Sequence, residues 1–194
     1  MCMNGVDQCH AFRMPVPSRS SSLDLERKGG WYSSRPFALR HLGLELHLVT
    51  KERLPPEPGV FVYNNRQANS QPLKDLYHIC EIFALPTFGD CLSMALSEAG
   101  ASGMAIISTD VAGIPEIVRN GETGLTVPAG DAASLTQALR DLATNPALRM
   151  TLGERAMAHV TRHYDAPTNA SLLLDLLKAE ANAARAEGRA APAR

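Results

Sequence analysis

The chain has 194 residues, of which 45% are apolar, 20% are charged and 5% are aromatic, and its formal net charge is −1 at pH 7. This length is sufficient for one domain with a sizeable core, and the near-neutral charge argues against broad binding to nucleic acid or to an anionic membrane surface. No apolar stretch approaches the roughly 20 residues of a membrane span, and the first residues lack the apolar segment of a secretory signal, so we expect a cytoplasmic protein.

Composition divides the chain into three parts. Residues 1–21 are rich in proline and serine and show no hydrophobic periodicity, so we expect a disordered or remnant segment. Residues 22–178 carry the alternating patterns of one folded domain. Residues 179–194 form an alanine- and arginine-rich helical tail that we expect to fray.

The first part of the domain is predicted to contain a short helix over 31–43, two strands and a second helix. Residues 44–50 alternate between apolar and polar side chains, and residues 60–63 form a short apolar run, so both segments are predicted strands. Residues 71–80 follow as a helix, with Ser70 as its N-terminal cap and Pro72 in its first turn.

Residues 81–124 contain two strand–helix units in succession and are the most informative part of the chain. The apolar run at 81–86 ends in proline, which suits a buried strand, and apolar residues at helical spacing predict a helix over 91–102. A second buried strand at 104–108 is followed by a polar, glycine-containing loop and a short helix over 115–118.

The last part of the domain is predicted to be mainly helical. After a strand at 125–128, Asp131 caps an amphipathic helix, and a further helix runs from 145 to about 159. The final helix begins at 165, and its leucine-rich stretch at 172–177 is expected to expose an apolar face, which would favour a homodimer or another partner.

The alternation of buried strands and helices predicts an α/β fold, namely a single Rossmann-like domain with a parallel sheet flanked by helices. Ligands of such sheets bind beyond the carboxyl ends of the strands, so loops 87–93 and 109–115 are expected side by side on one rim. A helix that begins near Cys91 or Leu92 directs backbone N–H groups and a partial positive charge into this rim, which suits phosphate.

Two carboxylates bracket the same predicted helix. Asp90 lies at the N-terminal end of this helix and Glu98 lies two turns further on. The separation is roughly 12 Å along the axis at about 1.5 Å per residue. Eight residues are close to a whole number of turns, so both carboxylates can point to one face. This arrangement matches a diphosphate-linked ligand with a hydroxylated ring at each end.

Residues 90–131 resemble the donor-binding domain of retaining glycosyltransferases of the GT-B fold, the group 1 or family 4 nucleotide-sugar transferases. The positions in register with the family pattern are Glu98 and Ala99, Gly103, Thr109 and Asp110, the Gly-Ile-Pro-Glu run at 113–116, and the run at 121–124. Asp90 departs from the pattern, because the family carries glutamate there. The resemblance extends over roughly residues 22–175.

The resemblance implies a site for a nucleotide-diphosphate sugar, used as donor in a retaining, metal-independent transfer of the hexosyl type. Glu98 would accept hydrogen bonds from the ribose hydroxyls and Asp90 from the sugar hydroxyls. The backbone N–H groups of Cys91, Leu92 and Ser93 would meet the diphosphate. No cofactor is implied, and the sequence contains no Asp-x-Asp triplet and no metal-type cysteine spacing.

Arg27 and Lys28 are the candidate cations for the diphosphate. The family uses a basic pair from this loop, and Lys28 with Gly29 matches its lysine–glycine step, whereas the second basic position falls near Ser22. Arg27 is a possible substitute for it. Negative charge grows on the leaving diphosphate as the glycosidic bond breaks, so Lys28 would stabilise the transition state together with the amides. The alternative interpretation of both residues is a solvated basic turn.

Two parts of the family's structure have no counterpart in this sequence. PVPSRSSS stands where the family has its first strand, and the upstream acceptor-binding domain is absent, so the chain resembles a transferase truncated at its N-terminus. One interpretation is therefore a transferase fragment that is incomplete alone. Another is a non-catalytic nucleotide-sugar-binding or interaction module that needs a partner acceptor domain. A GT-B sugar-nucleotide epimerase is a weaker alternative.

Overall fold

The computed structural model describes residues 10–15, for which it gives the backbone alone, and residues 44–50, 53, 55–64, 66–89 and 92–186. The predicted site residues Arg27, Lys28, Asp90 and Cys91 and the helix predicted over 31–43 therefore lie outside the described residues.

The core of the domain is a sheet of six parallel strands in the order β3-β2-β1-β4-β5-β6. The strands are β1 (His10–Pro15), β2 (Leu44–Val49), β3 (Val60–Tyr63), β4 (Ile82–Leu85), β5 (Ala105–Thr109) and β6 (Leu125–Val127). This order is that of a doubly wound sheet, in which the chain reverses its direction of travel between β1 and β4. The predicted α/β fold with a parallel sheet is confirmed.

Strand β1 corrects the expectation for the amino-terminal segment. The sequence predicts no ordered structure for residues 1–21, yet His10–Pro15 forms the central strand and pairs with β2 on one side and with β4 on the other. Six residues that end in proline and precede a Val-Pro-Ser run carry a weak strand pattern. Their conformation is set by the two neighbouring strands, whose backbone groups need partners on both sides.

Six helices accompany the strands among the described residues, and each lies at a predicted position with shifts of a few residues at some ends. They are α3 (Gln71–Ile79), α4 (Met94–Ala101), α5 (Ile114–Ile117), α6 (Ala132–Thr144), α7 (Pro146–His163) and α8 (Ala166–Ala186). Helix α7 continues to His163, beyond the predicted end near residue 159.

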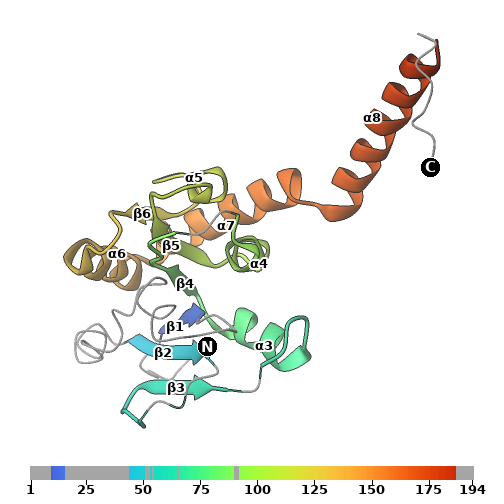
Figure 1. Cartoon of the computed structure of the whole chain (residues 1–194). Helices are drawn as coiled ribbons and strands as arrows, with labels where there is room; N and C mark the ends of the chain where they lie inside the picture. The colour runs from blue at the N-terminus through green and yellow to red at the C-terminus, as the bar shows by residue number, and fades with distance from the viewer. Residues whose placement is uncertain are drawn as a thin grey trace, which may run out of the picture.

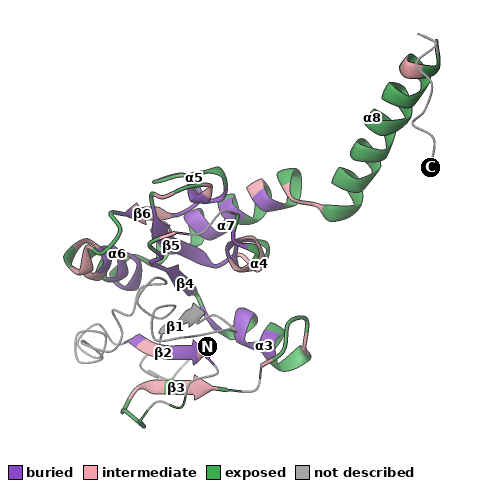
Figure 2. Cartoon of the chain, viewed as in Figure 1, coloured by how far each residue is buried: buried purple, intermediate pink, exposed green. Residues whose placement is uncertain are grey.

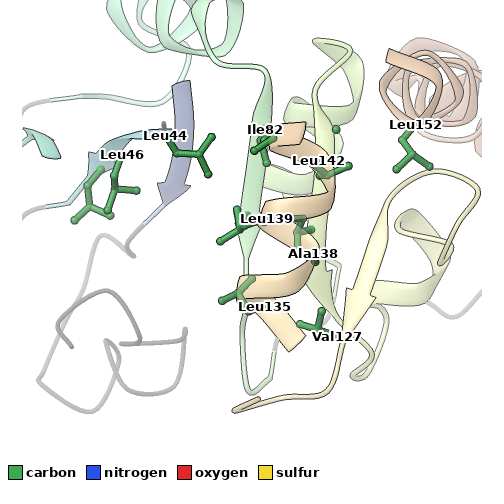
Figure 3. Close-up of a cluster of buried hydrophobic side chains, with 14 residues drawn as sticks. Leu44, Leu46, Ile82, Val127, Leu135, Ala138, Leu139, Leu142 and Leu152 are labelled. Atoms are coloured by element: carbon green, nitrogen blue, oxygen red, sulfur yellow. The ribbon is translucent and has the colours of Figure 1, made fainter. Parts of the chain in front are cut away.

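Helices cover both faces of the sheet. Successive side chains of β4 point to opposite faces, and they are buried on both. Ile82 and Ala84 contribute to the core under α6, with leucines of β2 and α6, whereas Phe83 and Leu85 point to the core shared with α3, α4, α5 and α7. Figure 3 shows the first of these cores, with Leu135, Leu139 and Leu142 of α6 facing the strands. Figure 2 shows buried residues along β2, β4 and β5 and on the inner sides of these helices, whereas β3 is mainly of intermediate burial.

Of the two predicted helix caps, one makes the expected side-chain hydrogen bonds and the other does not. The Asp131 carboxylate accepts hydrogen bonds from the N–H groups of Ala133 and Ser134 at 3.0 Å, as expected. Ser70 occupies the cap position of α3, but its side chain makes no capping bond. The reason is local: Pro72 has no N–H, and the Leu73 N–H donates instead to the Ser70 carbonyl at 3.0 Å.

Helix α8 extends away from the rest of the domain (Figure 1). Its large leucines are 52–60% exposed: Leu172, Leu173, Leu174, Leu176 and Leu177. The expected exposed apolar face is therefore present. Among the described helices, none has the length and apolar character needed to cross a bilayer.

Candidate functional site

The loops that follow β4 and β5 lie side by side at the carboxyl edge of the sheet. The Thr109 hydroxyl donates a hydrogen bond of 2.6 Å to the Thr87 carbonyl, and the Ser108 hydroxyl donates one of 2.8 Å to the Leu85 carbonyl. Thr87, Ser108 and Thr109 have no exposed surface. Buried, satisfied polar contacts of this kind hold two loops rigidly, so the predicted adjacency on one rim is confirmed.

A third loop, between β6 and α6, reaches the same edge. Gly130 has φ +80°, and a Cβ placed there would lie 3.0 Å from the ring of Phe88. Phe88 is 51% exposed and belongs to the loop after β4, in which the Gly89 N–H donates to the Thr87 hydroxyl at 3.2 Å. Glycine at 130 therefore allows the two loops to approach closely.

Helix α4 begins later than predicted. Its first residue is Met94 and its N-terminal cap is Ser93, whereas the sequence predicts a start near Cys91 or Leu92. The Leu96 and Ser97 N–H groups donate to the Ser93 carbonyl at 3.1 and 3.3 Å, which closes the first turn on a residue type favoured at caps.

The later start of α4 changes which backbone N–H groups lie at its N-terminus. Leu92 precedes the helix and is 48% exposed, and Ser93 is buried at 8% exposure with no capping bond from its side chain. Helix geometry leaves the first N–H groups, those of Met94 and Ala95, without intrahelical partners. These two N–H groups follow directly after those predicted from the sequence.

Glu98 lies on α4 and is half-buried. Its Oε2 accepts a hydrogen bond of 2.7 Å from the hydroxyl of Tyr77 on α3, and Oε1 has no hydrogen-bond partner among the described residues. Tyr77 is 6% exposed, and its ring is stacked with Phe83 at a centroid distance of 6.1 Å. One carboxylate oxygen is thus held by a residue of the core, while the other accepts no hydrogen bond from the described residues.

Sequence reasoning missed Tyr77 as a member of this site. It stands 21 residues before Glu98 and occupies the apolar face of α3 together with Leu73 and Leu76, so its pattern is that of an ordinary core residue. No local signal separates a tyrosine that packs from one that also orients a carboxylate.

A second group of side chains lies on the edge strand β3 and its neighbour β2. His47 is only 6% exposed; its Nδ1 lies 2.9 Å from the Tyr63 hydroxyl and its ring stacks on Phe61. Burial lowers the pKa of His47, and the nearby Glu45 carboxylate opposes this shift. Burial likewise raises the pKa of Tyr63.

Arg66, which follows β3, packs on this group. Its guanidinium lies 4.9 Å from the centroid of the Tyr63 ring, and its Nε is buried without a hydrogen-bond partner in the described part of the chain. Tyr63 ends β3, so this group sits at the carboxyl end of an outer strand.

Of the predicted site residues, the structure places Leu92 and Ser93 directly before α4 and Glu98 in the middle of this helix. The positions of Arg27, Lys28, Asp90 and Cys91 stay predictions, because they fall outside the described ranges.

Comparison with known proteins gives the same family by sequence and the same fold by structure. A family model described as glycosyl transferases group 1 matches residues 39–145, which is more than half of the chain. A D-inositol 3-phosphate glycosyltransferase of Streptomyces coelicolor is 28% identical over 126 residues, a match that covers 65% of this chain and 25% of that protein.

Two solved structures illustrate the fold. HepE of Anabaena, in complex with UDP-glucose, has a TM-score of 0.68 and 16% identity, with 89% of this chain and 49% of that one covered. The C-terminal domain of the group 1 glycosyl transferase LpcC of Francisella tularensis has a TM-score of 0.61 and 15% identity, with 81% and 87% covered.

The chain spans about a quarter of the curated relative and about half of HepE, and it corresponds to nearly the whole of the isolated LpcC domain. Its fold is therefore that of one Rossmann-like half of a GT-B glycosyltransferase. With the family model matched over most of the domain, the chain belongs to the glycosyl transferases group 1 family.

Proposed function

We propose that this chain binds the nucleotide-diphosphate sugar of a glycosyl transfer reaction at the carboxyl rim of its sheet. The observation that carries the proposal is the half-buried Glu98 carboxylate, held by Tyr77 at 2.7 Å on the helix that follows β4. Ligands of doubly wound sheets bind where the strand order reverses, and β4 is one of the two strands at that point. Family membership and the UDP-glucose bound by HepE support the same assignment.

In this proposal the carboxylates and the backbone N–H groups bind different parts of the donor. Glu98 accepts hydrogen bonds from the ribose hydroxyls through Oε1, and Asp90 accepts them from the transferred sugar. The diphosphate meets the N–H groups at the start of α4, with Cys91, Leu92 and Ser93 as the residues proposed from the sequence and Met94 and Ala95 added by the helix start.

The chemical step is proposed to be a retaining, metal-independent hexosyl transfer without a cofactor. Negative charge develops on the leaving diphosphate, and Lys28, with Arg27 beside it, would stabilise this charge together with the α4 amides. The catalytic residues in this scheme are Lys28, Asp90 and Glu98.

The chain is proposed to act in the cytoplasm and to be incomplete on its own, because the acceptor would be bound by a separate domain. The exposed leucines of α8 support a partner, either an acceptor domain or a second copy of the chain. The same observation favours the alternative function, a non-catalytic nucleotide-sugar-binding or interaction module that acts through such a partner.

Calorimetry with uridine and guanosine diphosphates tests the proposal. Glu98→Gln keeps the shape of the side chain and removes its charge, so we expect affinity for the preferred nucleotide to fall by about tenfold or more. Glu154→Gln, an exposed position on α7, is the matched control and should bind as the wild type does. Equal affinity in Glu98→Gln and wild type would refute the role of Glu98.

Adding a separate acceptor domain distinguishes the two candidate functions. Transfer of sugar in the mixture supports the enzyme, whereas nucleotide-sugar binding without transfer in any mixture supports the binding module.

A further inference from the structure

A cavity of about 420 Å³ lies between α7 and the loop that joins α5 to β6. Its wall on the helix side comes from one face of α7, at positions 155, 158, 159, 162 and 163, which recur at helical spacing. The loop contributes positions 119, 122 and 123. None of these residues belongs to the rim loops, so this basic cavity is separate from the proposed donor site. Figure 1 shows α7 and α5 as neighbours on one side of the sheet.

The basic cavity concentrates positive charge in a chain whose net charge is −1. Three arginines line it, Arg119, Arg155 and Arg162, against a single glutamate, Glu122. Glu122 lies 3.9 Å from Arg119, and both side chains are more than half exposed, so this pair neutralises little charge. Arg155 and Arg162 have no ion-pair partner in the part of the chain that the structure describes.

The elements that carry these charges are held in place by contacts that leave the cationic groups available. Thr123 is 5% exposed; its hydroxyl donates to the Ile117 carbonyl and accepts from the Arg119 N–H, both at 2.8 Å. The loop that carries Arg119 is therefore fixed through its backbone. His159 Nε2 lies 2.9 Å from the Glu116 carbonyl, which can only accept, so Nε2 donates and Nδ1 is left for another contact.

Arginines on a helix surface are commonly solvated, and such residues need no ligand. Here, however, two guanidinium groups and two imidazoles of α7 line one cavity together with the guanidinium of Arg119 from the loop after α5, and the lining contains a single carboxylate. Guanidinium groups bind phosphate oxygens through paired hydrogen bonds, and the volume is within the range of small-ligand sites. We propose that the basic cavity binds a phosphate monoester dianion, with the phosphate between the arginines and the organic group in the remaining volume.

The direct test follows the ring signals of His159 and His163 by NMR while inorganic phosphate is added to the full chain at low ionic strength. We expect these signals to shift and saturate. In Arg155→Gln/Arg162→Gln the apparent affinity should fall by about tenfold or more, since each guanidinium supplies charge-assisted bonds. Arg140→Gln/Arg185→Gln removes the same charge from exposed positions on α6 and α8 and should stay within about twofold of wild type.

Two further measurements distinguish phosphate binding in the basic cavity from binding at the donor site and identify the source of the phosphate. Affinity for uridine diphosphate should be unchanged in Arg155→Gln/Arg162→Gln, and circular dichroism should show that the variant is folded. Vesicles of phosphatidylcholine with and without phosphatidic acid provide the second measurement: binding that needs phosphatidic acid and both arginines indicates a lipid headgroup. Phosphate binding without vesicle binding indicates a soluble ester.

Histidine signals that do not respond to phosphate would overturn the proposal. So would an equal loss of affinity in the two double variants, because it would mean that net charge alone attracts the anion.

Discussion

The hydroxyl of Tyr77 donates a hydrogen bond of 2.7 Å to Oε2 of Glu98 and thereby joins α3 to α4. Tyr77 is 6% exposed and packs on Phe83 of β4, so it is part of the core shared by these elements. The orientation of the carboxylate at the rim is therefore coupled to the packing of the sheet beneath it.

Tyr77→Phe removes only the hydroxyl. Because Glu98 is half-buried and water can replace part of the lost bond, we expect a cost of about 1 kcal/mol in nucleotide binding, or about fivefold in Kd. Tyr164→Phe, which removes a hydroxyl near the end of α7, is the matched control. Calorimetry with uridine diphosphate measures both. Wild-type affinity in Tyr77→Phe would show that the carboxylate does not need this orientation.

Ser70→Ala and Asp131→Ala remove the side chains at two helix caps, and they should behave differently. The Asp131 carboxylate accepts two backbone N–H groups, so its loss should destabilise the fold by about 1 kcal/mol. The Ser70 hydroxyl is buried without a partner among the described residues, so Ser70→Ala should leave stability unchanged or raise it slightly. Urea denaturation compares the two, and a loss of stability in Ser70→Ala would reveal a contact for its hydroxyl.

Stability should depend on pH through His47. Burial places the pKa of His47 below 6.5, so between the folded and unfolded pKa values the unfolded chain binds more protons. The stabilisation is fully present above pH 6.5 and is lost as the pH falls through that value toward the folded pKa, with a slope of up to about 1.4 kcal/mol per pH unit.

Denaturation of wild type and His47→Gln at several pH values isolates this contribution. The variant should lose the part of the slope below pH 6.5 that belongs to the imidazole. Parallel curves for the two proteins would mean that another group is responsible.

Gly153→Ala should destabilise the fold, although alanine usually favours a helix interior. A Cβ at 153 would overlap the Gly103 carbonyl oxygen, which is backbone and cannot turn aside. We expect a loss of about 3 kcal/mol, because α7 would have to move away from the start of β5. Gly89→Ala, with nothing within 4 Å of the new Cβ, should change stability by less than about 0.5 kcal/mol. Thermal unfolding of the two variants makes the comparison.

Most of the secondary structure could be predicted from the sequence, because it rests on local patterns. The apolar periodicity of 44–50, 81–86 and 104–108 indicates buried strands, and each segment forms one. The Asp131 cap and the leucine spacing of α6 are equally local. The rim loops after β4 and β5 follow from the rule that parallel strands end at the same edge.

Tertiary structure decided the features that depend on partners distant in sequence. His10–Pro15 is a strand because β2 and β4 lie on either side of it, and Tyr77 meets Glu98 because α3 and α4 pack on the same face of β4. The basic cavity likewise exists only where α7 folds back beside the loop after α5. Periodicity specifies which side of an element is buried, whereas a hydrogen bond between two elements requires that both be placed to within a few tenths of an ångström, and only the packed core does that.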